Sequence, residues 1–138
     1  MRPRSEGVQL QLFKGRGARQ PAPEFHLQCL VADVLRRWQS PDWMWTHIGH
    51  GGLRTKATAG QLQRAGLMPG WPDLILLSPD GRPHFLELKR RGARLREEQE
   101  RFGAWCRAHA VPFAWHDNFT DALATLQAWR AVRGGIYA

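Results

Sequence analysis

Residues 69–89 read PGWPDLILLSPDGRPHFLELK, two apolar runs separated by a short polar segment. The segment Ser78-Pro79-Asp80-Gly81 suits a type I turn, because proline sets φ at the second position and Gly81 can adopt a positive φ. A type I turn followed by a left-handed glycine is a common three-residue hairpin loop with a bulge at its end. The stretch therefore predicts a β-hairpin with strands at about 73–78 and 83–89.

The turn also predicts the register of this hairpin. The loop pairs Ser78 with Arg82, so paired residue numbers sum to 160 and Asp73 lies opposite Glu87. Two carboxylates in that arrangement have Cβ atoms about 5 Å apart, which is unfavourable unless a divalent cation lies between them. Lys89 shares the face of Glu87, because side chains on a strand alternate with period 2. The alternative is a hairpin whose ends merely carry solvated charges.

Composition restricts the class of protein. The 138 residues fit one domain with a core of its own, and the formal net charge of +8 favours a polyanionic partner such as nucleic acid. Cys29 and Cys106 lie far apart in the sequence, which indicates a reducing compartment without a disulfide framework. The chain shows no membrane-spanning run and no signal peptide, and we expect a cytoplasmic protein of a bacterium or a phage-infected cell. Most of the seven tryptophans are expected in the core or at its edge.

Hydrophobic periodicity predicts an α/β fold in which helices flank a mixed four-stranded sheet. Residues 1–20 are read as a flexible basic arm, with one short strand at 8–12, and residues 21–138 as a single domain. The elements expected besides the hairpin are helices at about 24–39, 55–65, 96–110 and 121–132, and strands at 43–48 and 111–116. Residues 117–120 would cap the last helix.

Several motifs together resemble the PD-(D/E)xK signature of restriction-endonuclease-like nucleases. Flanking residues make the chain similar to the VRR-NUC family of that superfamily, of the stand-alone phage or bacterial type, over about residues 23–130. The motifs are Pro72-Asp73 with Glu87-Leu88-Lys89, Glu24-x-x-x-Gln28, His47-Ile48-Gly49-His50-Gly51-Gly52, Ala65-Gly66-Leu67-Met68-Pro69-Gly70-Trp71-Pro72-Asp73-Leu74, and Arg96-Glu97-Glu98-Gln99. The chain departs from the family at Gly49-His50-Gly51, where Asn-Glu-Gly is common, and at Arg96, where Ser is common.

The resemblance implies a metal-dependent, structure-specific DNA endonuclease that uses Mg²⁺ or Mn²⁺, on branched DNA such as four-way junctions. Asp73, Glu87 and the backbone carbonyl of Leu88 would be metal ligands, with Glu24 acting directly or through water. Lys89 would orient or deprotonate the attacking water. From the residues alone, Glu24 could instead serve the dipole of its own helix, and Lys89 could only neutralise the two acids.

Gln99, by resemblance, would support the catalytic site or contact DNA, and the alternative is a solvent-facing glutamine on the first helical turn. Phosphate contacts are expected from the glycine-rich loop and from the basic connector after Lys89. The residues concerned are His50, Arg54 and Lys56, and Arg90, Arg91, Arg94 and Arg96. A zinc site at His47 and His50 is disfavoured, because no cysteine accompanies them and no helix brings them together.

Two other functions compete with the nuclease. One is a catalytically inactive nucleic-acid-binding protein on a nuclease fold, which a missing carboxylate or lysine would indicate. Glu24, Asp73, Glu87 and Lys89 are all present. The other is a different metal hydrolase, or a structural subunit whose charge serves assembly. Symmetric cutting of a junction needs two sites, so the nuclease hypothesis includes a homodimer.

Overall fold

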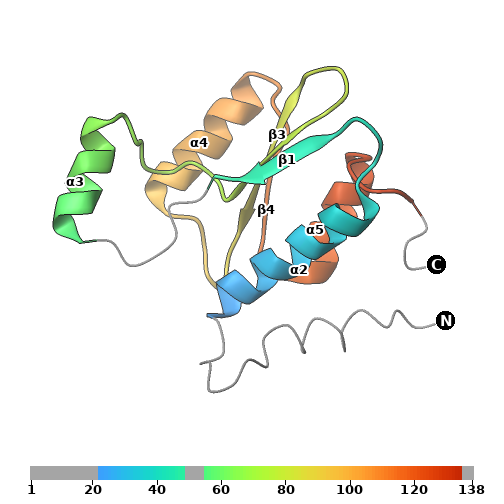
Figure 1. Ribbon diagram of the computed structural model, residues 1–138, viewed down its shortest axis with the longest axis horizontal. Coiled ribbons are helices and arrows are strands. Elements are labelled where there is room, and N and C mark those ends of the chain that lie inside the picture. Colours follow the sequence, from blue (N-terminus) through green and yellow to red (C-terminus); the bar gives the residue numbers. More distant parts are fainter. Residues whose placement is uncertain (1–21, 49–54, 135–138) are drawn as a thin grey trace. The chain divides into compact units, whose positions relative to one another are not determined.

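The computed structural model describes residues 22–48 and 55–134 (Figure 1). These ranges contain four helices and four strands in the predicted order. They are α2 (Pro23–Trp38), β1 (Met44–His47), α3 (Lys56–Arg64), β2 (Leu74–Leu77), β3 (Pro83–Leu88), α4 (Glu97–Ala108), β4 (Phe113–His116) and α5 (Phe119–Ala128). The expected basic arm and its strand at 8–12 lie outside the described residues.

The four strands form one mixed sheet in the order β1-β2-β3-β4. Strand β2 runs antiparallel to both β1 and β3. Between β3 and β4, the Phe85 N–H donates to the Pro112 carbonyl and the Lys89 N–H donates to the His116 carbonyl, each at 2.9 Å. Donor and acceptor numbers rise together, so β3 and β4 are parallel. The predicted α/β fold with a mixed four-stranded sheet is confirmed.

The β2–β3 hairpin has the predicted turn and register. The Ser78 N–H donates to the Arg82 carbonyl at 3.0 Å, and the Gly81 N–H donates to the Ser78 carbonyl at 2.8 Å. Gly81 has φ of +82°, the left-handed conformation that the bulge requires. Leu74 pairs with Leu86, so the paired numbers sum to 160 as predicted.

Contacts divide the chain into two compact units. Within the described ranges, the helical unit comprises residues 22–43, Leu88–Ala93 and 116–134, and the hairpin unit comprises Met44–Glu87 and Arg94–Trp115. The hairpin unit holds most of the sheet with α3 and α4. This division does not test whether either unit folds independently, so a single domain over residues 21–138 stays a prediction.

In the helical unit, α2 packs against α5. Val31, Val34 and Leu35 of α2 are buried, as are Ala122 and Leu126 of α5, each set at the three- and four-residue spacing of one helical face. The predicted cap of the last helix is present at Asn118, whose Oδ1 accepts from the Asp121 N–H at 2.9 Å. Packing and capping together fix the start and the buried face of α5.

An aromatic cluster forms part of the core of the hairpin unit. Phe102 of α4 contacts the rings of Trp71 and Phe85, with centroid distances of 4.9 Å in both pairs, and that of Phe113 at 6.0 Å. Such pairs contribute about 0.5–1.5 kcal/mol each beyond the area that they bury. The cluster therefore fixes α4 against strands β3 and β4 and against the segment that precedes β2.

Of the two positions expected for the tryptophans, the core and its edge, the core holds only one of them. All seven lie in the described ranges, and only Trp43 is buried, with 7% of its surface exposed. Trp38, Trp71, Trp105 and Trp115 are exposed by 38–57%. Aromatic residues in apolar runs can lie at the boundary between core and solvent, because their large rings are seldom covered on every side.

None of the helices in residues 22–48 and 55–134 has the length and apolar character needed to cross a bilayer.

Two histidines, the buried His84 and the half-buried His116, predict a stability that falls in mild acid. Burial lowers the pKa of both His84 and His116, while the unfolded chain retains a pKa of about 6.5. The unfolded state therefore binds more protons as pH falls below about 6.5, and the free energy of unfolding decreases until the folded pKa is passed. Urea denaturation at about pH 7.5 and at about pH 5.5 should show this decrease. The decrease in the free energy of unfolding between the two pH values should be smaller in His116→Gln. If the decrease is the same as in wild type in both His116→Gln and His84→Gln, these two histidines do not cause it.

Candidate metal centre

Asp73 lies directly before β2, and two groups at the end of the neighbouring strand β1 bind its backbone carbonyl. The Asp73 carbonyl accepts from the Ile48 N–H at 2.8 Å and from the His47 ring Nδ1 at 2.8 Å. Pro72, the preceding residue, is buried. These contacts fix the position from which the Asp73 side chain projects.

Glu87 lies on β3 and is almost fully buried, with 3% of its surface exposed. Its Oε1 accepts a 2.9 Å hydrogen bond from the Gln99 side-chain Nε2. The Oε1 of the same glutamine accepts from the Arg96 backbone N–H at 2.8 Å, at the start of α4. Because both ends of the Gln99 amide are engaged, its NH₂ group is directed at Glu87.

The carboxylates of Asp73 and Glu87 converge within the hairpin unit. One carboxylate oxygen of Asp73 lies within 4.8 Å of one carboxylate oxygen of Glu87. Two ligand oxygens on opposite sides of Mg²⁺ are about 4.2 Å apart, so the separation of the two carboxylates is close to the one that a shared ion requires. Carboxylate oxygens are the ligands that Mg²⁺ and Mn²⁺ prefer. The donor set therefore fits a hard divalent cation.

The remaining predicted metal-site residues lie in the helical unit. Lys89 follows β3 directly and is buried, with 5% of its surface exposed, and Leu88 is fully buried. Glu24 lies in the first turn of α2 and is half-buried. The roles assigned to Glu24, Lys89 and the Leu88 carbonyl stay predictions.

The basic residues expected at phosphates are partly described. Arg90, Arg91, Arg94, Arg96 and Lys56 are all exposed, whereas His50 and Arg54 lie outside the described residues. The connector that carries the arginines has a fixed bend, where the Gly92 N–H donates to the Asp117 Oδ2 at 2.9 Å. This hydrogen bond is the main cause that lowers the pKa of Asp117. Phosphate binding by these side chains stays a prediction.

Sequence reasoning missed two residues that position Asp73. Sequence reasoning placed His47 in a family motif and weighed it as a zinc ligand, yet its ring binds the Asp73 carbonyl because β1 pairs with β2 and His47 lies opposite Leu74. Gly70 has φ of +91°, and a Cβ there would lie 2.5 Å from the Glu98 backbone oxygen. The glycine therefore permits the segment before Asp73 to touch the first turn of α4.

Comparison with known proteins agrees with this geometry. The profile of the family described as "VRR-NUC domain" matches residues 32–117, well over half of the chain. The match includes Asp73, Glu87, Lys89 and Gln99 and leaves out Glu24. No match was found among curated proteins.

A solved structure described as "VRR_NUC domain" is similar to 79% of this chain and 99% of its own, with a TM-score of 0.57 and 14% identity. At that identity the likeness shows a shared fold. Together with the profile match, it confirms the resemblance inferred from the motifs. The chain belongs to the VRR-NUC family, a family of PD-(D/E)xK-like nucleases.

Proposed function

We propose that the protein is a metal-dependent, structure-specific DNA endonuclease that hydrolyses phosphodiester bonds in branched DNA such as four-way junctions. The observation that carries the proposal is the pair Asp73 and Glu87. Their carboxylate oxygens lie within 4.8 Å of one another in a chain that belongs to a nuclease family. Holding two like charges so close together, with Glu87 buried and Asp73 half-buried, is costly unless a cation compensates them.

The proposed cofactor is Mg²⁺ or Mn²⁺, held by Asp73, Glu87 and the Leu88 carbonyl, with Glu24 as a further ligand directly or through water. When bound, the ion would neutralise charge that develops on the phosphate. Gln99 positions the Glu87 carboxylate, as its 2.9 Å hydrogen bond indicates. The Lys89 ammonium would orient the attacking water and stabilise the negative charge of the transition state.

The charge of the chain supports a nucleic-acid substrate that is bound without regard to its base sequence. The net charge is +8, and the exposed arginines of the connector suit contacts with phosphates. Phosphate contacts fix position and orientation without reading bases. Because cleavage of both strands of a junction needs two sites, the proposal includes a homodimer.

The test is cleavage of end-labelled single-stranded, duplex, flap and four-way-junction DNA with Mg²⁺ or Mn²⁺, with EDTA and the Lys89→Ala variant as negative controls. We expect cleavage that is faster on branched DNA and is abolished in both negative controls. Arg107→Ala, on the exposed part of α4, is the matched control because it removes one positive charge outside the proposed site.

Two results would overturn the proposal. Binding of DNA without cutting under any metal would identify an inactive nucleic-acid-binding protein. Neither binding nor cutting would remove nucleic acid as the partner. Cutting that persists in EDTA would overturn the metal assignment alone.

A further inference from the structure

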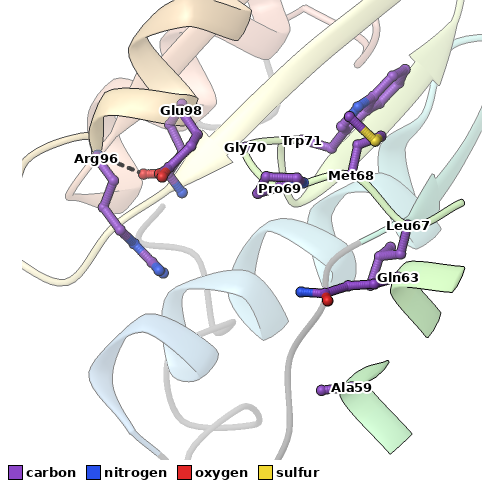
Figure 2. A pocket seen from close by; sticks show the side chains of 10 residues that line it. Ala59, Gln63, Leu67, Met68, Pro69, Gly70, Trp71, Arg96 and Glu98 are labelled. Carbon is purple, nitrogen blue, oxygen red and sulfur yellow. Dashed lines mark hydrogen bonds between the residues drawn. The ribbon is translucent and has the colours of Figure 1, made fainter. Parts of the chain in front are cut away.

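A cavity of about 400 Å³ lies within the hairpin unit, between the segment that leads to Asp73 and the first turn of α4. One side is mostly apolar and includes Leu67, Met68 and Trp71. The other side comes from the start of α4 and includes Arg96 and Gln99. Figure 2 shows Arg96 and Glu98 on one side, facing Met68, Trp71 and Gln63 across the cavity.

Trp71 is held firmly and still keeps much of its ring in solvent. It packs against Phe102 at a centroid distance of 4.9 Å and against Phe85, edge to face, at 6.0 Å. Yet 45% of Trp71 and 60% of Met68 are exposed. A fixed aromatic ring of this kind provides a stacking surface at little cost in side-chain entropy.

Gln99 connects the cavity to the candidate metal centre. It lines the cavity, and its Nε2 donates to the Glu87 carboxylate at 2.9 Å. Trp71 precedes Asp73 by two residues in the sequence. A nucleotide whose phosphate lies at Asp73 and Glu87 therefore has this cavity beside it, and the Arg96 guanidinium carries the charge that suits its backbone.

We propose that this cavity binds one unpaired nucleobase of the DNA strand that is cut, next to the scissile phosphate. This inference rests on the proposed function. A paired base has both faces covered by its neighbours in the stack, so only an unstacked base can lie on Trp71. Gln63 and Glu98 would offer hydrogen-bond partners to the edge of the base. The volume lies within the range of about 300–1,000 Å³ that is usual for small-ligand sites.

The experiment compares branched substrates that carry either a normal base or an abasic nucleotide, placed in turn at each unpaired position around the cut. We expect the abasic nucleotide to lower kcat/KM about tenfold at one position, as the loss of one base–aromatic stack predicts. Trp71→Ala should lower cleavage of the normal substrate by a similar factor and abolish the discrimination. Trp71→Phe should retain it, and so should the control Trp105→Ala, which removes another exposed tryptophan of the same unit.

The substrate comparison uses the wild-type protein, so it stands even if Trp71→Ala fails to fold. Equal cleavage of normal and abasic substrates at every position would overturn the inference and leave the nuclease proposal intact. Discrimination that Trp71→Ala retains at full strength, in protein with native circular dichroism, would also overturn it.

A second readout separates the two proposals. With 2-aminopurine at the unpaired position and EDTA present, binding should quench the fluorescence in wild-type protein and in Trp105→Ala, but much less in Trp71→Ala. Quenching without cleavage under any metal would support the cavity and overturn the nuclease. If there were neither quenching nor cleavage, both proposals would be wrong.

Discussion

Replacing Glu87 by Gln is expected to lower the rate of metal-dependent DNA cleavage by about 10³-fold, the upper range for loss of one group that stabilises transition-state charge. The substitution keeps the shape of the side chain and an oxygen that can accept from Gln99. It removes a negative charge that would hold the proposed cation. Single-turnover cleavage with Mg²⁺, measured beside DNA binding in EDTA, would separate chemistry from affinity.

Two matched variants sharpen this test. Asp73→Asn should lose activity to a similar extent, because it removes the other carboxylate of the pair. Glu100→Gln on the exposed part of α4 should keep wild-type rates. A Glu87→Gln protein that retains cleavage within a few-fold of wild type would show that the acidic pair does not hold the ion.

Replacing Gly70 by Ala is expected to destabilise the protein by about 2–4 kcal/mol, from backbone strain and steric overlap together, and to remove most of its activity. A non-glycine residue at a positive φ costs about 1–3 kcal/mol. The added Cβ would also lie 2.5 Å from the Glu98 backbone oxygen. The segment at Gly70 and helix α4 must then move apart. This movement displaces Asp73 and also Gln99, whose side chain binds Glu87. Thermal denaturation and cleavage assays would measure the two losses.

Gly81→Ala is the matched control for this substitution. Gly81 has φ of +82°, close to the +91° of Gly70, but an added Cβ there would meet no atom within 4 Å. The control therefore carries the backbone strain without the clash, and it should cost only about 1 kcal/mol and leave cleavage unchanged. Equal losses in both variants would show that the contact with Glu98 has no importance for the site.

The positions of Asp73 and Glu87 could be predicted from the residues of the hairpin turn. The turn Ser78-Pro79-Asp80-Gly81 determines the loop type, and the loop type determines the register, so the pairing of Leu74 with Leu86 follows from a few neighbouring residues. The convergence of Asp73 and Glu87 follows from the same register. Helix spacing and the Asn118 cap were likewise readable, because the interactions concerned span only a few residues.

Contacts between distant segments were decided by the tertiary structure alone. The hydrogen bond from Gln99 to Glu87 joins residues on α4 and β3, and sequence reasoning had left a solvent-facing glutamine open as the alternative. His47 reaches the Asp73 carbonyl only because β1 pairs with β2. Neither contact has a local pattern, since its geometry depends on how whole elements pack.

The exposure of the tryptophans also could not be predicted from the sequence. The sequence predicted that most tryptophans lie in the core or at its edge and could not distinguish the two for Trp71, which packs against Phe102 and Phe85 and keeps 45% exposure. Hydrophobic periodicity and turn chemistry thus determined the fold class, the hairpin register and the acidic pair, because these depend on short-range geometry. The packing of α4 against the segment before Asp73 decided which side chains support that pair and which remain free to meet a substrate, because burial is a property of the whole folded chain.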